Sequence, residues 1–388
     1  MKDKLAKRSQ GIQQSSIRAV TRRIEAVRGI NLGQGNCDLP PHPEVIQAAQ
    51  SAIEEGHNSY TLFDGIAPLK EAIVERCVAY NGLDITDRNV LVTGGATGAF
   101  ECICKGFLEP GDEVIMFEPI YQYHVRQVRE RGAILRYIKL NPPDWSFSVD
   151  ELEAAFSERT KLFVFANPNN PCGKVFSHDE LLLIGDTCRK KGVIAVVDEV
   201  YEYIISDGAK HLSLASLPGM FEHTLTISSA SKTLFVTGWR VGWLIAPEAI
   251  LDPLGVKSDE TYVCAPAPLQ HAVAQALRLG DDFFNSIRTP FSRKRNLLSG
   301  ALVEAGFKPY NPEGAYYTLA DYRPLGFKDD VSAMVSLIEQ VGIGAVPGNS
   351  FFPSEENTGM LRFCFALSDD QIERACEMLT SRQLAAAC

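Results

Sequence analysis

The sequence has no apolar run long enough to cross a bilayer as a helix, which takes about 20 residues. Residues 1–27 are basic and contain arginine and serine, but they lack the hydrophobic stretch of a secretory signal. We therefore expect no membrane partner and a cytoplasmic location. We interpret residues 1–27 as an amphipathic surface helix or arm, with an organellar transit peptide as the alternative.

The sequence also has fewer basic than acidic residues, and its cysteines show no regular spacing. The 38 basic residues are outnumbered by 48 acidic ones, giving a net charge of −10, and such a field repels nucleic acid. The ten cysteines follow neither a metal-ligand nor a disulfide pattern, and Cys102 and Cys104 point to different faces of a predicted helix. We expect reduced, buried thiols, no metal site and no nucleic-acid partner.

The 388 residues have the composition of a globular protein, with 45% hydrophobic and 22% charged residues and without low-complexity tracts or repeats. This length suits two structural units. Between residues 90 and 246, short apolar runs alternate with amphipathic helical patterns. The runs are NVLVTGG, DEVIMFEP, AILRYIKL, TKLFVFANP, VIAVVDEVY, TLTISSASK and RVGWLIAP. This alternation predicts an α/β domain with a largely parallel sheet covered on both faces.

One helix of this region has clear start and stop signals. In SHDELLLIGDTCRKKG, Ser177 is the expected N-cap, Glu180 completes a capping box and Gly192 ends the helix.

The pattern changes after Phe283. A long polar helix is predicted over FFNSIRTPFSRKRNLLSGALVEAG, followed by GAYYTLADY, a helix, GIGAVPG and MLRFCFALS. We expect a smaller α+β unit here, into which the N-terminal segment also packs. The predicted domains are an N-terminal arm with part of the small domain (1–40), a large domain (41–285) and a small C-terminal domain (286–388).

Ligands of open α/β sheets bind at the carboxyl ends of the strands, and several polar residues fall there. The turn GGATGAF, residues 94–100, is followed by a helix whose free N–H groups suit a phosphate, although a plain tight turn is the alternative. Asp198 ends a buried strand, where a carboxylate needs a cationic or donor partner, and its alternative is a structural aspartate. Tyr201 follows within local reach.

Two further segments add an amide, a lysine and an arginine. FANPNNPCG is either a simple turn or a loop that presents the Asn170 amide to a ring oxygen or to a substrate carboxylate. In SSASKTLFVTGWRVGW, Lys232 lies beside apolar sequence, which lowers the pKa of an ammonium and suits an imine-forming nucleophile; a surface loop lysine is the alternative. Ser229, Ser231 and Arg240 would bind a phosphate attached near that lysine.

Together these groups are the set that pyridoxal 5'-phosphate (PLP) requires. A lysine binds its aldehyde, a carboxylate keeps its pyridine nitrogen protonated, and donors hold its phosphate.

The chain also resembles class I and II PLP-dependent aminotransferases of fold type I, near the kynurenine/glutamine and aspartate aminotransferase branches. The resemblance runs through INLGQGNCDLPPHPEV, SYTLFDGIAPLKEAI, NPNNPCGKVFS, DEVY, SSASKTLFVTGWRVGW and LRFCFALS. NCDLPP departs from the kynurenine branch, and VPGNSFF is closer to the aspartate branch. The resemblance implies a large domain with a mostly parallel seven-stranded sheet between helices, plus a smaller α+β domain.

The resemblance also implies roles for individual residues. Lys232 would bind the cofactor and carry the proton, Asp198 would pair with the pyridine nitrogen, and Tyr201 and Asn170 would hold the ring oxygen. Tyr121 would stack on the ring, and His124 would support Asp198. The phosphate would be held by Ala96, Thr97, Ser229, Ser231 and Arg240.

Three further positions concern the substrate and the partner subunit. Arg362 would bind the substrate α-carboxylate, Gly35 would line the substrate pocket, and Tyr60 would reach the phosphate of a second subunit, which implies a homodimer with shared sites. The implied activity moves an amino group from an L-amino acid to a 2-oxo acid by a ping-pong mechanism. The alternatives are a PLP-dependent β-lyase and a non-catalytic regulator that keeps the fold.

Overall fold

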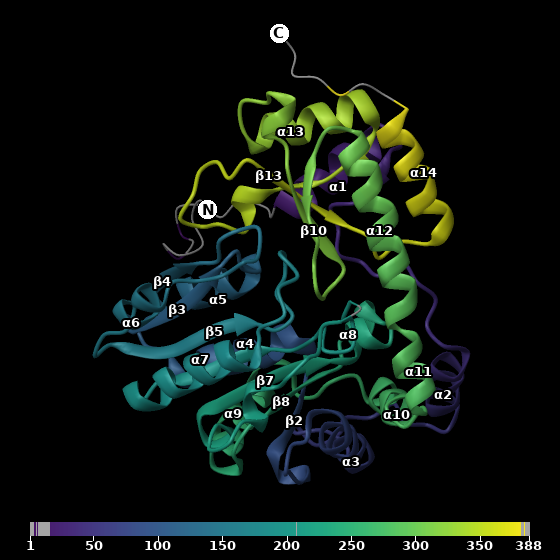
Figure 1. The fold of residues 1–388 in the computed structure, drawn as a ribbon. Helices are drawn as coiled ribbons and strands as arrows, with labels where there is room; N and C mark the ends of the chain where they lie inside the picture. Colours follow the sequence, from purple (N-terminus) through teal and green to yellow (C-terminus); the bar gives the residue numbers. More distant parts are fainter. Residues whose placement is uncertain (1–3, 5, 7–15, 207, 382–383, 385–388) are drawn as a thin grey trace. The chain divides into compact units, whose positions relative to one another are not determined.

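A computed structural model describes residues 4, 6, 16–206, 208–381 and 384. The chain divides into two compact units (Figure 1). The large unit comprises Cys37–Ser292 and Pro312–Ala315, and the small unit comprises Met1–Asn36, Arg293–Asn311 and Tyr316–Cys388. No helix among the described residues is both long and apolar enough to span a membrane.

The large unit contains a seven-stranded sheet. Its strands are β2 (Val90–Thr93), β3 (Glu113–Glu118), β4 (Ile134–Lys139), β5 (Thr160–Ala166), β6 (Ile194–Asp198), β7 (Thr224–Ser229) and β8 (Gly242–Ile245). Their order is β2-β8-β7-β6-β5-β3-β4. β8 is antiparallel to β2 and β7, and the remaining pairs are parallel. This arrangement confirms the prediction of a mostly parallel sheet.

Helices accompany the sheet in the large unit. They are α2 (Pro43–Glu54), α3 (Ala67–Arg76), α4 (Gly95–Phe107), α5 (Gln122–Glu130), α6 (Val149–Ala154), α7 (His178–Lys191), α8 (Ala230–Thr233), α9 (Glu248–Tyr262), α10 (Ala267–Ala276) and α11 (Asp281–Ser286). Alternate residues of the strands enter different apolar clusters, as expected for a sheet buried on both faces. In β3, Val114 and Met116 pack in the cluster that contains Phe100 of α4, whereas Phe117 packs on Phe165 and Phe176.

The start and stop signals of α7 are confirmed. The Ser177 hydroxyl accepts from the backbone N–H of Glu180, and the Glu180 carboxylate accepts from the backbone N–H of Ser177. Gly192 follows the helix with a left-handed φ of 67°, which glycine adopts without the penalty of a side chain.

The long helix predicted after Phe283 is interrupted. The structure has two helices instead, α11 and α12 (Arg288–Glu304), with Ile287 between them. Pro290 lies in the first turn of α12, where its missing N–H is tolerated. Its ring would clash with the carbonyl of Ser286 in a continuous helix, so the break falls at this point.

Among its described residues, the small unit combines two short sheets with four α-helices. Its antiparallel sheet has the order β12-β13-β10-β9, and β1 pairs in parallel with β11. The strands are β1 (Ile30–Asn31), β9 (Lys308–Tyr310), β10 (Tyr317–Asp321), β11 (Ile343–Gly344), β12 (Val346–Pro347) and β13 (Met360–Cys364). The helices are α1 (Ser16–Ala26), α12, α13 (Asp330–Ser336) and α14 (Asp369–Thr380).

The N-terminal interpretation as an amphipathic helix is confirmed for α1. This helix buries Val20 and Ile24 and exposes its basic residues. Most of the preceding segment lies outside the described residues.

Candidate active site

One edge of the large-unit sheet collects the strand ends that carry polar residues. Because β8 is antiparallel to both β2 and β7, all the other strands run in one direction, and β8 starts where they end. Gly242, the first residue of β8, pairs with Thr93 at the end of β2 and with Ser229 at the end of β7. Asp198 ends β6 at the same edge. This is the edge at which open α/β sheets bind ligands.

A turn of two glycines links β2 to α4. The Thr93 hydroxyl donates to the carbonyl of Gly95 at 3.0 Å, and Gly95 has a φ of 76°, a conformation that favours glycine. The first N–H groups of a helix have no carbonyl partner within it, and in α4 these include Ala96 and Thr97. The turn therefore directs free donors and the positive end of a 13-residue helix toward the edge.

Arg240 lies against this glycine turn. Its guanidinium donates from Nη1 to the carbonyl of Thr237 at 2.9 Å and from Nη2 to that of Gly94 at 3.5 Å. A Cβ on Gly95 would lie 2.5 Å from Nη2 of Arg240, and a Cβ on Gly242 would lie 2.6 Å from the backbone nitrogen of Ala96. The absence of side chains at both glycines thus lets a guanidinium and a helix N-terminus approach the same point.

The segment around Lys232 follows β7 at the other side of Gly242. Ser229 and Ser231 are buried, and Lys232 lies on the short helix α8, partly exposed, between the buried Ala230 and Leu234. Apolar neighbours of this kind reduce the solvation of a lysine.

Asp198 is a buried carboxylate with an imidazole beside it. Its Oδ2 lies 3.4 Å from Nε2 of His124, and its Oδ1 accepts from the backbone N–H of Val200 at 3.3 Å. His124 in α5 packs on Phe100 and meets the ring of Tyr121 edge-on at 90°. Nδ1 of His124 is buried and has no partner among the described residues. The structure therefore brings together the Asp198, His124 and Tyr121 of the sequence prediction.

Asn170 and Tyr201 lie on the loops that follow β5 and β6, and both are buried. The neighbouring asparagines have clear structural functions: Asn167 donates to the carbonyl of Leu212, and Asn169 donates to that of Pro119. These bonds fix the loop on which Asn170 lies.

Arg362 and Gly35 belong to the small unit. Arg362, in the middle of β13, is 1% exposed and donates to the carbonyl of Gly33 at 2.6 Å. Its guanidinium lies 4.1 Å from the ring centre of Tyr317. Tyr316 donates from its hydroxyl to the carbonyl of Gly35 at 3.0 Å. A guanidinium held by aromatic rings in a buried site is suited to bidentate carboxylate binding.

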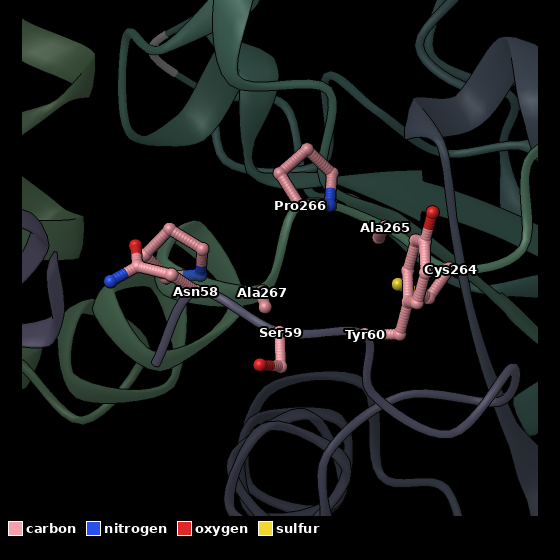
Figure 2. A pocket seen from close by; sticks show the side chains of 8 residues that line it. Asn58, Ser59, Tyr60, Cys264, Ala265, Pro266 and Ala267 are labelled. Atoms are coloured by element: carbon pink, nitrogen blue, oxygen red, sulfur yellow. The ribbon is translucent and has the colours of Figure 1, made fainter. Parts of the chain in front are cut away.

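Tyr60 is 82% exposed, and Arg240 is the one other predicted site residue that is exposed rather than buried or partly buried. It lines an open hollow of about 640 Å³ formed by residues 58–60 and 264–268 (Figure 2). Leu62, two residues on, is also strongly exposed.

Several residues of this edge were not identified from the sequence. Gly242 and Tyr262 shape the glycine turn: the Tyr262 ring would lie 3.5 Å from a Cβ on Gly94, and the Ser258 hydroxyl donates to the Tyr262 hydroxyl at 2.7 Å. Burial raises the pKa of Tyr262. For Gly242 itself, the signal in the sequence was its place as the glycine of RVGW. A buried group of Glu199, Glu202 and His211 was also missed, because its members are spread over 13 positions.

The comparisons with known proteins agree on one family. Residues 27–379 match aminotransferase class I and II. A Mycobacterium tuberculosis protein with the name probable N-succinyldiaminopimelate aminotransferase is 36% identical over 376 residues, covering 93% of this chain and 94% of that protein. Kynurenine–oxoglutarate transaminase 3 of Rattus norvegicus is 34% identical, covering 97% of this chain and 89% of the relative.

Solved structures show the same likeness. The N-succinyldiaminopimelate aminotransferase of Mycobacterium tuberculosis has a TM-score of 0.93 at 32% identity, covering 97% of this chain and 99% of that one. A single mutant of Thermus thermophilus aspartate aminotransferase has a TM-score of 0.90 at 29% identity, with the same coverage.

The chain belongs to the class I and II aminotransferases, and it is a PLP-dependent aminotransferase of fold type I. The predictions of family, fold class, activity and cofactor are thereby confirmed, and no comparison favours the β-lyase. The large-unit edge suits this cofactor, since glycines 95 and 242 leave the approach to a helix N-terminus and a guanidinium clear of side chains.

Proposed function

We propose that the enzyme moves the α-amino group of an L-amino acid to a 2-oxo acid in two half-reactions at the carboxyl edge of the large-unit sheet. The observation that carries this proposal is the convergence on Gly242 of the α4 N-terminus, Arg240 and the segment that contains Lys232. Asp198 adds a buried carboxylate at the same edge.

The phosphate of the cofactor would be held at the glycine turn. The N–H groups of Ala96 and Thr97 would donate to it, together with the Ser229 and Ser231 hydroxyls and the Arg240 guanidinium. Backbone donors, a helix dipole and a cation at one point suit a dianion. Tyr121 would pack on the cofactor ring, and Asn170 and Tyr201 would donate to its oxygen.

Three side chains would control protons. PLP, when bound, supplies an electron-withdrawing ring that stabilises negative charge at the substrate α-carbon. Asp198 would hold a proton at the pyridine nitrogen, and His124 would orient Asp198 through the 3.4 Å contact. Lys232 would bind the cofactor and then act as the base and acid that moves the substrate α-proton.

Arg362 would bind the α-carboxylate that every amino-acid and 2-oxo-acid substrate shares. Its fixed guanidinium, held by Gly33 and the aromatic rings, supports this role. Gly35 would line the same pocket. The relative named kynurenine–oxoglutarate transaminase makes 2-oxoglutarate the first acceptor to test.

We further propose a homodimer in which Tyr60 reaches the phosphate of a second copy. Two observations support this: Tyr60 is strongly exposed and lines an open hollow (Figure 2), and Leu62, two residues on, is also strongly exposed. Large apolar side chains in an exposed patch mark interaction surfaces. A reducing compartment such as the cytoplasm is supported by nine free thiols among the described cysteines.

The decisive variant is Lys232→Ala, with the exposed Lys190→Ala in α7 as the matched control. We expect Lys232→Ala to abolish the visible absorbance that substrate bleaches and to stop multiple turnover, while the control keeps both. Sustained turnover by Lys232→Ala would refute the proposal. An amino-donor panel with 2-oxoglutarate and pyruvate then identifies the substrates, and release of ammonia with pyruvate would indicate a β-lyase instead.

A further inference from the structure

Three ionisable side chains are buried together at the turn that follows β6. Glu199, Glu202 and His211 are each less than 10% exposed, and their ligand-type atoms lie within 4.8 Å of one another. Nε2 of His211 is 3.4 Å from Oε2 of Glu199. Charged groups in such a place are unfavourable unless they share protons or balance each other. We call these three residues the buried triad.

Two members of the buried triad, Glu199 and Glu202, lie in the turn that follows Asp198 and contains Tyr201. The backbone N–H of Glu202 donates to the carbonyl of Glu199 at 2.9 Å, which closes the turn. Asp198 contacts His124, whereas its neighbour Glu199 contacts His211. The two consecutive carboxylates therefore have different histidine partners, and the position of one restricts the other.

Two polar side chains connect the buried triad to other elements. Asn81 donates from Nδ2 to Oε2 of Glu202 at 3.1 Å and to Oε2 of Glu199 at 3.5 Å. The hydroxyl of Ser228 donates to Oε1 of Glu202 at 2.9 Å, and Ser228 precedes Ser229 at the end of β7. The triad thus joins the ends of β6 and β7, which carry Asp198 and Ser229, to the π-helical turn Cys77–Asn81.

A balanced charge distribution explains how the triad is tolerated. Burial raises the pKa of Glu202. For His211, burial lowers the pKa but the Glu199 carboxylate raises it, and the net direction is upward. The upward direction at Glu202 favours its neutral form, and the upward direction at His211 favours an imidazolium 3.4 Å from the Glu199 carboxylate. The titratable groups that interact with the triad are Cys77, Tyr80 and Tyr203. Two cations lie behind these tyrosines: Arg288 donates to the Tyr80 hydroxyl, and the Arg76 guanidinium lies 5.6 Å from the ring centre of Tyr203.

We propose that Glu199, Glu202 and His211 are positioning residues for transamination, a charge-balanced triad that fixes the turn and thereby the electrostatic setting of Asp198. This inference rests on the proposed role of Asp198 at the cofactor ring. This role differs from a packing role because it requires the charges of Glu199 and His211 to change the electrostatic potential at the bound cofactor.

The test compares Glu199→Gln, His211→Asn and Glu202→Gln with the surface control Glu222→Gln. For each holoenzyme, the pH midpoint of the visible cofactor absorbance and the cofactor dissociation constant are measured. We expect Glu199→Gln and His211→Asn to shift the midpoint by about one pH unit, because each removes one member of a buried ion pair, and to weaken cofactor binding about tenfold. Because burial raises the pKa of Glu202 and so favours its neutral form, we expect Glu202→Gln to have the smallest effect of the three.

The double variant Glu199→Gln/His211→Asn keeps the inference testable if a single variant does not fold. Removing both charges together leaves no unpaired ion, so the double variant should lose less cofactor affinity than the two single losses combined. Midpoints equal to the parent's in both single variants, or a stoichiometric divalent metal in the purified parent, would overturn the inference. A parent without the cofactor absorbance, or turnover by Lys232→Ala, would instead refute the proposed function.

Discussion

The two edges of the large-unit sheet each carry a buried carboxylate, and the two carboxylates differ in the number and strength of their partners. At the amino edge, Glu113 starts β3 and accepts from Arg136 at 3.0 Å, from Arg159 at 2.6 Å and from the Ser157 hydroxyl at 2.8 Å. Hydrogen bonds from Arg136 and Ser157 lower its pKa to about 2. At the carboxyl edge, Asp198 has one backbone donor and one histidine as its partners in the described part of the chain.

The difference separates a carboxylate that serves stability from one that is available for chemistry. Glu113 has two cations and a hydroxyl, so it needs no ligand to compensate its charge. Asp198 is also buried, yet its contacts are long at 3.3 and 3.4 Å. A buried carboxylate with long contacts has room for a further strong donor, which a protonated pyridine nitrogen would provide.

The sharpest way to break this comparison is Asp198→Asn. The amide keeps the shape but removes the negative charge, so we expect a loss of transamination rate of about 10³-fold. The free energy of unfolding of the apoenzyme should change by only about 1 kcal/mol. Rates come from the half-reaction with an amino donor, and stability comes from urea titration. The exposed Asp252→Asn in α9 is the matched control, and a rate loss below tenfold in Asp198→Asn would contradict the assigned role.

A second change tests the glycine geometry of the carboxyl edge. In Gly242→Ala the new Cβ would lie 2.5 Å from the carbonyl carbon of Gly95, so the start of α4 has to shift. We expect the cofactor dissociation constant to rise about 10- to 100-fold, equal to about 1.4–2.7 kcal/mol. Gly238→Ala is the matched control because a Cβ there meets nothing within 4 Å. Equal affinities in the two variants would show that the phosphate is not held at this turn.

The sequence was sufficient for the strands of this sheet and for the polar residues at their ends. Each buried strand is a short apolar run closed by turn residues, so the position of Asp198 at the end of β6 follows from local pattern alone. The pairing of Asp198 with His124 needed the family resemblance, because the two residues are 74 positions apart and the register that joins them is tertiary.

Other features could not be read from the sequence for physical reasons. The function of Gly242 depends on a backbone that lies 147 positions away, at Gly95. The break between α11 and α12 was missed because Pro290 is compatible with a helix start as well as with a helix end. Glu199 and Glu202 directly follow Asp198 and Tyr201 in a turn, where glutamates are usually solvated. Their burial is evident only from the structure, in which His211 lies beside Glu199.

The amino edge gives the converse prediction, a change in stability without a change in chemistry. Glu113→Gln removes the acceptor of two guanidinium groups that remain half-exposed to water. Since both cations can be solvated in the variant, we expect the free energy of unfolding to fall by only about 1–2 kcal/mol. Cofactor affinity and half-reaction rates should match the parent. A rate loss as large as that of Asp198→Asn would remove the distinction between the two edges.

The smallest predicted effect is the pH dependence of the same contribution. The pKa of Glu113 lies at about 2 in the folded protein, below its ordinary value of 4.5, so its carboxylate stabilises the fold at pH values above the ordinary pKa. This stabilisation is lost as the pH falls through that value toward 2, because the unfolded chain takes up the proton first. The difference in the free energy of unfolding between the parent and Glu113→Gln should therefore shrink by about 1 kcal/mol between pH 6 and pH 3. The change is small because water screens the charges of Arg136 and Arg159. Urea titration of both proteins at the two pH values measures it, and a difference that stays constant or grows would show that the Glu113 carboxylate is not stabilised by its arginine partners.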